Sequence, residues 1–341
     1  MLYLLPYELL VVIVKYCDWT TRKSLSLVSR RLRDPSQSII FKKMILPGSK
    51  YGTLVRKCAS EGREHLSEVT QNDRLLSYIR TLITRSPSML FTAFYRMQQL
   101  RDIKLLTVPL TTTMLDQLCE VLSTRLYNLE LWWCSYPMRY TAQQAVLKIH
   151  QLDYESIDDS SLRAPTKVLA AIIERSLSSI AELFLSSDLS VLAYFGKMPR
   201  LTSLKILMKS DRNNEGFRDF LVANPQLAKL ALIGPFNDLA LLPPSALPNL
   251  RTIRARADMM QYLVQDRPVE RVEIFEPSSL EFITDGVRVL SRSAAPIVEL
   301  TLNLDHYRTH LGKILDAVVE AIPHLERMRL SFNVEVRSIL Y

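Results

Sequence analysis

The segment Leu325-Glu326-Arg327-Met328-Arg329-Leu330-Ser331-Phe332-Asn333 decides the fold, because its spacing returns along most of the chain. An aliphatic residue is followed by two others, a second apolar residue, one other residue and a third apolar residue. Clear further copies are Leu126-x-x-Leu129-x-Leu131-x-x-Cys134 and Leu227-x-x-Leu230-x-Leu232. The last two apolar positions of each copy are two residues apart, as on one face of a strand, so each copy predicts a short β-strand.

The same spacing returns about every 25 residues on average. It begins at Ile79, Leu100, Leu126, Ile149, Ile180, Leu201, Leu227, Leu250, Val269, Ile297 and Leu325. A period of this length resembles the leucine-rich repeat, whose units span roughly 20 to 29 residues. In that family the ninth position is Asn or Cys, and its side chain bonds the backbone at the turn. Here Cys134 and Asn333 match, and the other copies carry Asp188, Lys209, Pro235, Asp258, Pro277 or Asp305, so the resemblance implies a degenerate array.

Helical stretches separate the predicted strands at residues 164–177, 216–223 and 311–322, where apolar residues recur at spacings of three and four. Prolines that stop a helix follow such stretches at Pro199, Pro225, Pro248 and Pro323. This order predicts an α/β leucine-rich-repeat solenoid over residues 76–341, with a curved parallel sheet inside and helices outside. The alternative, a doubly wound α/β domain, requires long buried strands and a Gly-rich phosphate turn, and the sequence has neither.

The first 46 residues follow a different pattern. They open with Leu5-Pro6-Tyr7-Glu8-Leu9-Leu10 and an apolar helix to Tyr16, and continue through Asp18-Trp19-Thr20-Thr21 to a helix containing Ser24-Leu25-Ser26-Leu27-Val28-Ser29-Arg30-Arg31-Leu32-Arg33. This order resembles an F-box, and the resemblance implies an all-helical module over residues 1–46 that binds a Skp-type adaptor protein. Carried over by position, the adaptor-binding residues are Leu5, Pro6, Leu9, Ile13, Leu25 and Val28. The sequence departs from the family at Leu32, where many F-boxes have Trp, and in the short segment between the helices.

Two interpretations of this N-terminal module remain open. Together with the repeats it resembles the substrate receptors of SCF-type cullin-RING ubiquitin ligases. Alternatively, the same helices are a cap on the first repeat, because the terminal repeats of a solenoid need atypical caps. A module of this size buries little apolar surface by itself, so either the solenoid or a second protein must cover the remainder. Residues 47–75 are predicted to be a linker with bridging helices.

The net charge of +8 is concentrated at the N-terminal end of the 341 residues. Residues 1–57 hold eleven Lys and Arg against three acids, and bases and acids balance in the remainder. Such a basic surface favours association with an acidic partner. The alternatives are a solvated surface that aids solubility, or nucleic-acid binding, which the lack of interleaved aromatic residues and of a known motif argues against.

The solenoid predicts a second binding surface, because side chains alternate along a strand and the flanking residues point to the concave face. Acids gather in the earlier strands and arginines in the later ones, with Trp132, Phe184 and Phe275 as aromatic anchors. The predicted client-binding residues are Trp132, Phe184, Lys205, Arg254, Arg256, Arg271, Phe275, Arg327 and Arg329. An equally good interpretation is a set of ordinary cross-strand ion pairs, such as Arg254 with Glu273, which contribute little.

Signatures of catalysis are missing from the sequence. The five histidines form no recognised triad or metal motif, and neither a P-loop nor Gly-x-Gly-x-x-Gly occurs. We therefore expect no catalytic residues, no metal and no cofactor. The four cysteines are far apart, which indicates a reducing compartment, and the apolar runs are too short for a membrane span. Glu8 and Pro6 interrupt the apolar start, which argues against a signal peptide.

These observations lead to one expected function and one alternative. The expected function is a non-catalytic substrate-recognition subunit of an SCF-type ubiquitin ligase, which binds a Skp-type adaptor and through it a cullin-RING scaffold. It would bind an unknown protein client on the solenoid and act in the cytoplasm or nucleus, without a nucleic-acid or membrane partner. The alternative is a leucine-rich-repeat scaffold for protein interactions, with no ligase role.

Overall fold

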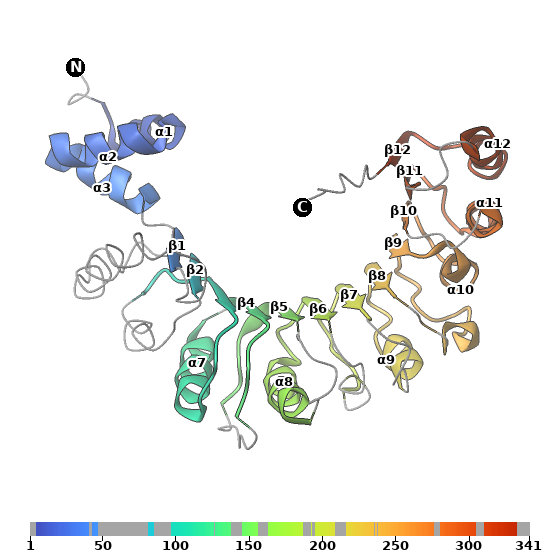
Figure 1. Ribbon diagram of the computed structural model, residues 1–341, viewed down its shortest axis with the longest axis horizontal. Helices are drawn as coiled ribbons and strands as arrows, with labels where there is room; N and C mark the ends of the chain where they lie inside the picture. The colour runs from blue at the N-terminus through green and yellow to red at the C-terminus, as the bar shows by residue number, and fades with distance from the viewer. Residues whose placement is uncertain are drawn as a thin grey trace, which may run out of the picture. The chain divides into compact units, whose positions relative to one another are not determined.

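The computed structural model describes residues 5–40, 43–46, 81–84, 97–125, 127–137, 145–155, 163–186, 192, 195–208, 216–234, 236, 238–275, 280–304 and 310–332 (Figure 1). The chain divides into two compact units. The first consists of Met1–Asp158 with Arg163–Val168, and the second of Asp159–Leu162 with Leu169–Tyr341. The predicted linker, residues 47–75, lies outside the described residues, and its boundary with the N-terminal module stays a prediction.

Three helices begin the first unit: α1 (Tyr7–Tyr16), α2 (Trp19–Val28) and α3 (Arg30–Ile40). Pro6 is the N-cap of α1, where its missing N–H costs nothing. Asp18 is the N-cap of α2, and its Oδ1 accepts a hydrogen bond from the Thr21 N–H at 2.8 Å. This bond lowers the pKa of the Asp18 carboxyl. Both α1 and α2 pack on α3.

The rest of the first unit is a parallel sheet in chain order. Its strands are β1 (Lys43–Leu46), β2 (Thr81–Thr84), β3 (Asp102–Leu106), β4 (Tyr127–Trp132) and β5 (Ile149–Glu155), with α7 (Thr112–Thr124) between β3 and β4. The aliphatic side chains of β3 and β4 form part of the core, since Ile103, Leu105, Leu129 and Leu131 are fully buried. Burial alternates along β3, as the predicted strand pattern requires.

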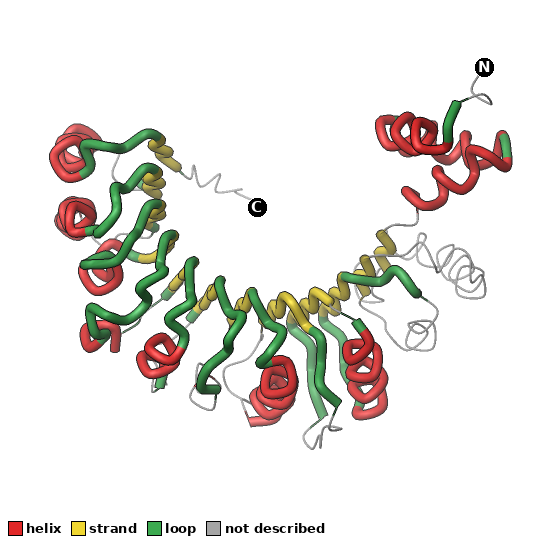
Figure 2. Tube along the Cα trace, turned by 180° about the vertical axis from the view of Figure 1, so that it is seen from behind, coloured by secondary structure: helices red, strands yellow, loops and turns green. Residues whose placement is uncertain are grey.

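The second unit repeats this arrangement. Its strands are β6 (Glu182–Ser186), β7 (Ser203–Leu207), β8 (Lys229–Ile233), β9 (Thr252–Ala255), β10 (Arg271–Ile274), β11 (Glu299–Asn303) and β12 (Arg327–Ser331), each paired in parallel with the next. The connecting helices are α8 (Arg163–Ser176), α9 (Phe217–Ala223), η3 (Asp238–Leu241), η4 (Ala257–Met259), α10 (Met260–Leu263), α11 (Leu280–Val289), η5 (Leu290–Arg292) and α12 (Leu311–Ala321). These helices lie on one side of the sheet, and the strands form a curved row whose other side, here called the open face, carries none of them (Figure 2).

This structure is the predicted α/β solenoid. Every position where the repeat begins lies at or just before a strand, and the three predicted helical stretches correspond to α8, α9 and α12. The ninth-position cysteine also behaves as the family resemblance implies. Cys134 Sγ donates hydrogen bonds to the carbonyls of Leu105 at 3.4 Å and Trp132 at 3.6 Å, and burial raises the pKa of its thiol to about 11. Asn333, the other match, lies outside the described residues.

Two features differ from the sequence-based expectation. The predicted helix through Ser24–Arg33 is broken, because α2 ends at Val28 and Ser29 is extended before α3 begins. The predicted all-helical N-terminal range also ends in a strand, since β1 pairs with β2 over four residues. Met44-Ile45-Leu46 followed by Pro47 is the apolar run that could have indicated this strand.

Candidate interaction surfaces

The first candidate is a surface of exposed apolar side chains on α1 and α2, here called the helix surface. Its members are Leu9, Val12, Ile13, Tyr16 and Leu27, all classed as exposed, with Leu27 at 75%. In the same helix Leu10 and Val14 are buried, at 1% and 0% exposure. The two buried residues are one turn apart on one stripe of α1, and the exposed ones lie beside it, so α1 is apolar on more than the side that packs on α3.

Two of the six predicted adaptor-binding residues, Leu9 and Ile13, belong to this surface. Leu9 is 48% exposed and Ile13 is 38% exposed, and Pro6 is exposed as well. Leu5 and Leu25 are half-buried, and the side chain of Val28 lies outside the described residues. Exposed leucine and isoleucine at adjacent turns form a contiguous patch, which is the kind of surface that a partner protein covers.

The second candidate is the open face. Over β3, β4 and β5 of the first unit it is mainly acidic, since Asp102, Glu130, Asp153 and Glu155 share it there with one base, Lys104. Lys104 forms an ion pair with Glu130 on the next strand. Trp132 is half-buried at the end of β4, and its indole ring lies 6.5 Å from that of Trp133 between centroids. This face therefore offers an aromatic side chain among carboxylates.

In the second unit the strand register arranges the open-face side chains in rows across the sheet. The first row is Glu182, Ser203, Lys229, Thr252, Arg271, Glu299 and Arg327, and the second is Phe184, Lys205, Ala231, Arg254, Glu273, Thr301 and Arg329. Bases outnumber acids two to one in these rows. The open face of the second unit is thus basic where that of the first is acidic, as the distribution of charges in the sequence indicates.

Ion pairs use the acids of this face. Arg254 Nε lies 3.2 Å from Glu273 Oε1, which is the cross-strand pair expected from the sequence. Glu299 Oε2 lies 3.7 Å from Arg271 Nε and 3.4 Å from Arg327 Nη2, so one carboxylate serves two arginines. All of these side chains are partly exposed, and such pairs stabilise the fold by about 1 kcal/mol or less each.

Two of the predicted client-binding residues are placed differently from the prediction. Phe275, expected as an exposed anchor, is 3% exposed. It follows the last residue of β10, where the alternation of the strand no longer applies, and the Arg254 guanidinium lies over its ring at 5.6 Å. Arg256 also lies beyond its strand, and both its Nε and its Nη2 donate hydrogen bonds to the Asp258 carboxylate. Neither residue belongs to the rows of the open face.

Lys229 is exposed on the first row, between Ser203 and Thr252, as alternation along β8 predicts, although it is not among the predicted client-binding residues. Two buried polar residues were not predicted from the sequence. Asn224 is fully buried after α9, where its Nδ2 donates to the Phe220 and Gly196 carbonyls and its Oδ1 accepts from the Met198 N–H. Arg267 is buried before β10, and no local pattern distinguishes it from the exposed arginines.

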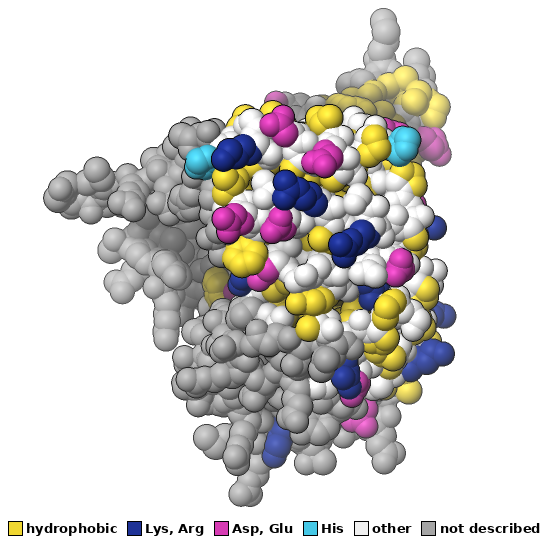
Figure 3. Space-filling model, turned by 90° about the vertical axis from the view of Figure 1, so that its right-hand side faces the viewer, with side chains coloured by type: hydrophobic (Ala, Val, Ile, Leu, Met, Phe, Trp, Pro, Cys, Tyr) yellow, Lys and Arg dark blue, Asp and Glu magenta, His cyan; other side chains and the backbone are white. Residues whose placement is uncertain are grey.

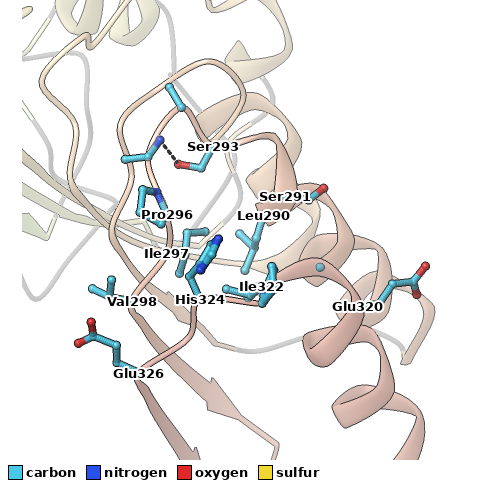
Figure 4. A pocket seen from close by; sticks show the side chains of 14 residues that line it. Leu290, Ser291, Ser293, Pro296, Ile297, Val298, Glu320, Ile322, His324 and Glu326 are labelled. Carbon is cyan, nitrogen blue, oxygen red and sulfur yellow. Dashed lines mark hydrogen bonds between the residues drawn. The ribbon is translucent and has the colours of Figure 1, made fainter.

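A pocket of about 690 Å³ lies at the edge of the second unit, where the chain enters β11 and β12. Figure 4 shows His324 between Ile297 and Ile322, with Glu320 and Glu326 at the rim. Its lining includes none of the predicted site residues.

The helix-bearing side of this unit carries interspersed basic and acidic side chains (Figure 3).

In the described part of the chain, no three His, Cys, Asp or Glu side chains are grouped in a way that could hold a metal ion. Within the same residues, every helix is too short or too polar to cross a membrane.

The sequence matches no known family in a scan of protein families, and it matches no curated protein. Among solved structures, the chain is similar to the leucine-rich repeat-containing protein LegL7 from Legionella pneumophila, with 13% identity and a TM-score of 0.43 over 74% of this chain and 83% of that one. It is also similar to a chain of the Rad7 and Elc1 complex in yeast, with 14% identity and a TM-score of 0.40 over 90% and 91% of the two chains. The solenoid fold of this chain itself follows from the strand order and register described above.

Proposed function

We propose that this protein is the substrate-recognition subunit of an SCF-type ubiquitin ligase. Its helix surface binds a Skp-type adaptor, the adaptor joins it to a cullin-RING scaffold, and the open face of the solenoid binds a protein client. The protein has no catalytic role of its own and acts in the cytoplasm or nucleus. Its contribution is proximity, because holding a client near the ligase makes the transfer of ubiquitin effectively intramolecular.

One observation carries this proposal: α1 exposes Leu9 and Ile13 to solvent, whereas Leu10 and Val14 of the same helix, which packs on α3, are buried. A helix that only caps a solenoid needs one apolar stripe, on the side that it packs. Here a second apolar stripe faces outward, together with Leu27 of α2. Burying each such side chain against a partner contributes about 1.5 to 3 kcal/mol, enough for a stable complex from a few residues.

The charges near the helix surface support the same partner. Lys15 and Lys23 are exposed on α1 and α2, and the segment that contains them carries the excess positive charge of the chain. A basic rim around an apolar centre accelerates association with an acidic partner and excludes basic ones. We therefore expect the adaptor to present an acidic rim around an apolar groove.

The experiment is a pull-down of a purified Skp-type adaptor by the full-length chain. We expect the wild-type chain to retain the adaptor and the double variant Leu9→Asp/Ile13→Asp to lose it, because carboxylates would be buried in the interface. Val319→Asp is the matched control, since Val319 is 75% exposed on α12, far from this surface in the sequence. Retention of the adaptor by the double variant would contradict the proposal.

The alternative function, a protein-interaction scaffold without a ligase role, is favoured by a different observation. The bases of the open face do not depend on α1 or α2, so the solenoid can bind a protein without an adaptor. If the wild-type chain does not retain the adaptor, this scaffold function becomes the better interpretation.

A further inference from the structure

We propose that the open face of the second unit binds an acidic peptide segment over β7, β8 and β9. This inference rests on the proposed function in that it names the chemical class of the client. The surface in question, here called the basic section, consists of the open-face residues Ser203, Lys205, Leu207, Lys229, Ala231, Ile233, Thr252 and Arg254.

The basic section holds three bases and no acid. The nearest acids in the same rows are Glu182 on β6 and Glu273 on β10. Within the described residues, no carboxylate forms an ion pair with Lys205 or Lys229. Neighbouring strands lie about 4.8 Å apart, so the central base Lys229 lies about a Debye length or less from the strands that carry Lys205 and Arg254, and their potentials add there. An anion bound there relieves their mutual repulsion.

Arg254 is held in a position that suits a carboxylate. Its Nε lies 3.2 Å from Glu273 Oε1, and the central carbon of its guanidinium lies 5.6 Å from the centroid of the Phe275 ring. Its two terminal nitrogens make no hydrogen bond to any residue that the structure describes, and the side chain is 41% exposed. Lys205, on the opposite edge of the basic section, is also held over an aromatic ring. Its Nζ lies 4.4 Å from the centroid of the Phe184 ring. Two cations fixed by aromatic rings lose little freedom when they bind an anion.

Small side chains leave room between these cations. Ala231 separates Lys205 from Arg254 in the second row, and Ser203 and Thr252 flank Lys229 in the first. The backbones of Lys205 and Arg254 are two strands apart, roughly 10 Å. Their charged groups lean outward, toward Phe184 and toward Glu273, so they are at least that far apart, and an extended segment of about three or more residues spans the distance. Two carboxylates of one extended segment can therefore reach both bases.

An apolar position lies next to the cations. Leu207 and Ile233 are paired at the ends of β7 and β8, and both are half-buried on the open face. They follow Lys205 and Ala231 by two residues, which is about 7 Å along a strand. The occupant is therefore an Asp- and Glu-rich segment of a protein that also carries an aliphatic or aromatic side chain close to its acids.

The test is a binding titration of the full-length chain by fluorescence anisotropy. The probe is a dye-labelled synthetic peptide of about ten residues that contains several Glu and two Leu, long enough to cross the section. A matched probe carries Gln in place of Glu. We expect the Glu probe to bind at least ~10-fold more tightly than the Gln probe, with an affinity that falls as salt rises.

The variants locate the site. Lys229→Glu/Arg254→Glu should weaken the Glu probe ~10-fold or more, and Lys313→Glu/Arg292→Glu, with the same change in net charge on exposed residues of α12 and η5, should not. Ile233→Ala should weaken the Leu-containing probe and leave a Leu-free acidic probe unchanged. Thermal unfolding followed by circular dichroism verifies that each variant is folded.

Three outcomes would overturn the inference: no binding of the Glu probe, equal loss in the control variant, or equal binding of a single-stranded oligonucleotide of similar length. The last would indicate a site for polyanions in general. None of these measurements involves the adaptor. If the chain retains the adaptor but does not bind the Glu probe, only the acidic client is rejected. If the chain binds the Glu probe but does not retain the adaptor, only the ligase proposal is rejected.

Discussion

Arg267 shows how a single residue can be structural where its neighbours are available for binding. Its side chain is 1% exposed, and its guanidinium donates hydrogen bonds to four backbone carbonyls: Nε to Ala246 at 2.8 Å, Nη1 to Tyr262 at 2.8 Å and to Gln265 at 3.4 Å, and Nη2 to Pro243 at 3.0 Å. Burial lowers the pKa of this guanidinium from its ordinary value. A charged side chain can remain ionised in the interior when several hydrogen bonds compensate its desolvation. Here the carbonyls come from the segment before β9 and from the segment between β9 and β10.

The prediction at this scale is that Arg267→Met destabilises the protein by about 2 to 4 kcal/mol, because four backbone carbonyls lose a hydrogen-bond donor, the Ala246 carbonyl at a buried position. Arg251→Met is the matched control. Arg251 is exposed and pairs with Glu270, so its replacement should cost less than about 1 kcal/mol. Urea unfolding followed by circular dichroism measures both. If the two substitutions lowered the free energy of unfolding equally, the hydrogen bonds of Arg267 would not stabilise the fold more than an exposed ion pair does.

At the scale of one element, α1 separates adjacent leucines into two roles. Leu10 and Val14 pack within the three-helix module, and Leu9 and Ile13 remain at the solvent. The residues are equally apolar, and a helical turn of 3.6 residues places the two pairs on different sides. The helix is therefore stabilised by one stripe and keeps the other for a partner.

We predict that Leu10→Ala destabilises the helical module by about 2 to 4 kcal/mol, while Leu9→Ala changes its stability by less than about 0.5 kcal/mol. Hydrogen–deuterium exchange of the α1 amides in the full-length chain distinguishes them, because faster exchange reports opening of this element. If Leu9→Ala accelerated exchange as much as Leu10→Ala, the outward stripe would be part of the fold and the adaptor proposal would lose its basis.

On the scale of the whole molecule, stability is built from contacts between neighbouring repeats. Each strand pairs only with the strands before and after it in the sequence, as the register of β6 to β12 shows. The aliphatic side chains between sheet and helices form the core, and the strands of the first unit follow the same rule. The stability of such an array is approximately a sum of repeat and interface terms.

A core substitution should consequently act locally. Leu300 is fully buried in β11, and Leu300→Ala should cost about 2 to 5 kcal/mol. We expect faster hydrogen–deuterium exchange in β10, β11 and β12 and unchanged exchange in β3, β4 and β5. Thr301→Ala is the control, because Thr301 is the next residue of β11 and lies on the open face. Its exchange rates should stay near those of the wild-type protein in all six strands. Equal acceleration in both units would instead indicate one cooperative unit.

Much of the fold could be predicted from the sequence because its signals are short-range. Apolar spacing within six residues located the strands of the solenoid, and the helices α8, α9 and α12 followed from periodicity. Pro225 and Pro323 mark the ends of α9 and α12. The same alternation identified most of the charged residues on the open face. These features depend on each residue's near neighbours along the chain, which the sequence displays directly.

The sequence alone determined that this chain is a repeat solenoid preceded by a helical module, and which residues alternate toward each face of its strands. Only the tertiary structure decided that Phe275 is buried, that Arg267 is bonded to backbone carbonyls in the interior, and that Leu9 and Leu10 of α1 differ in burial. It also decided that no carboxylate among the described residues forms an ion pair with Lys205 or Lys229. The physical reason is that burial and pairing depend on which distant segments pack against a residue. Side chains of the same type therefore differ in function once the chain has folded.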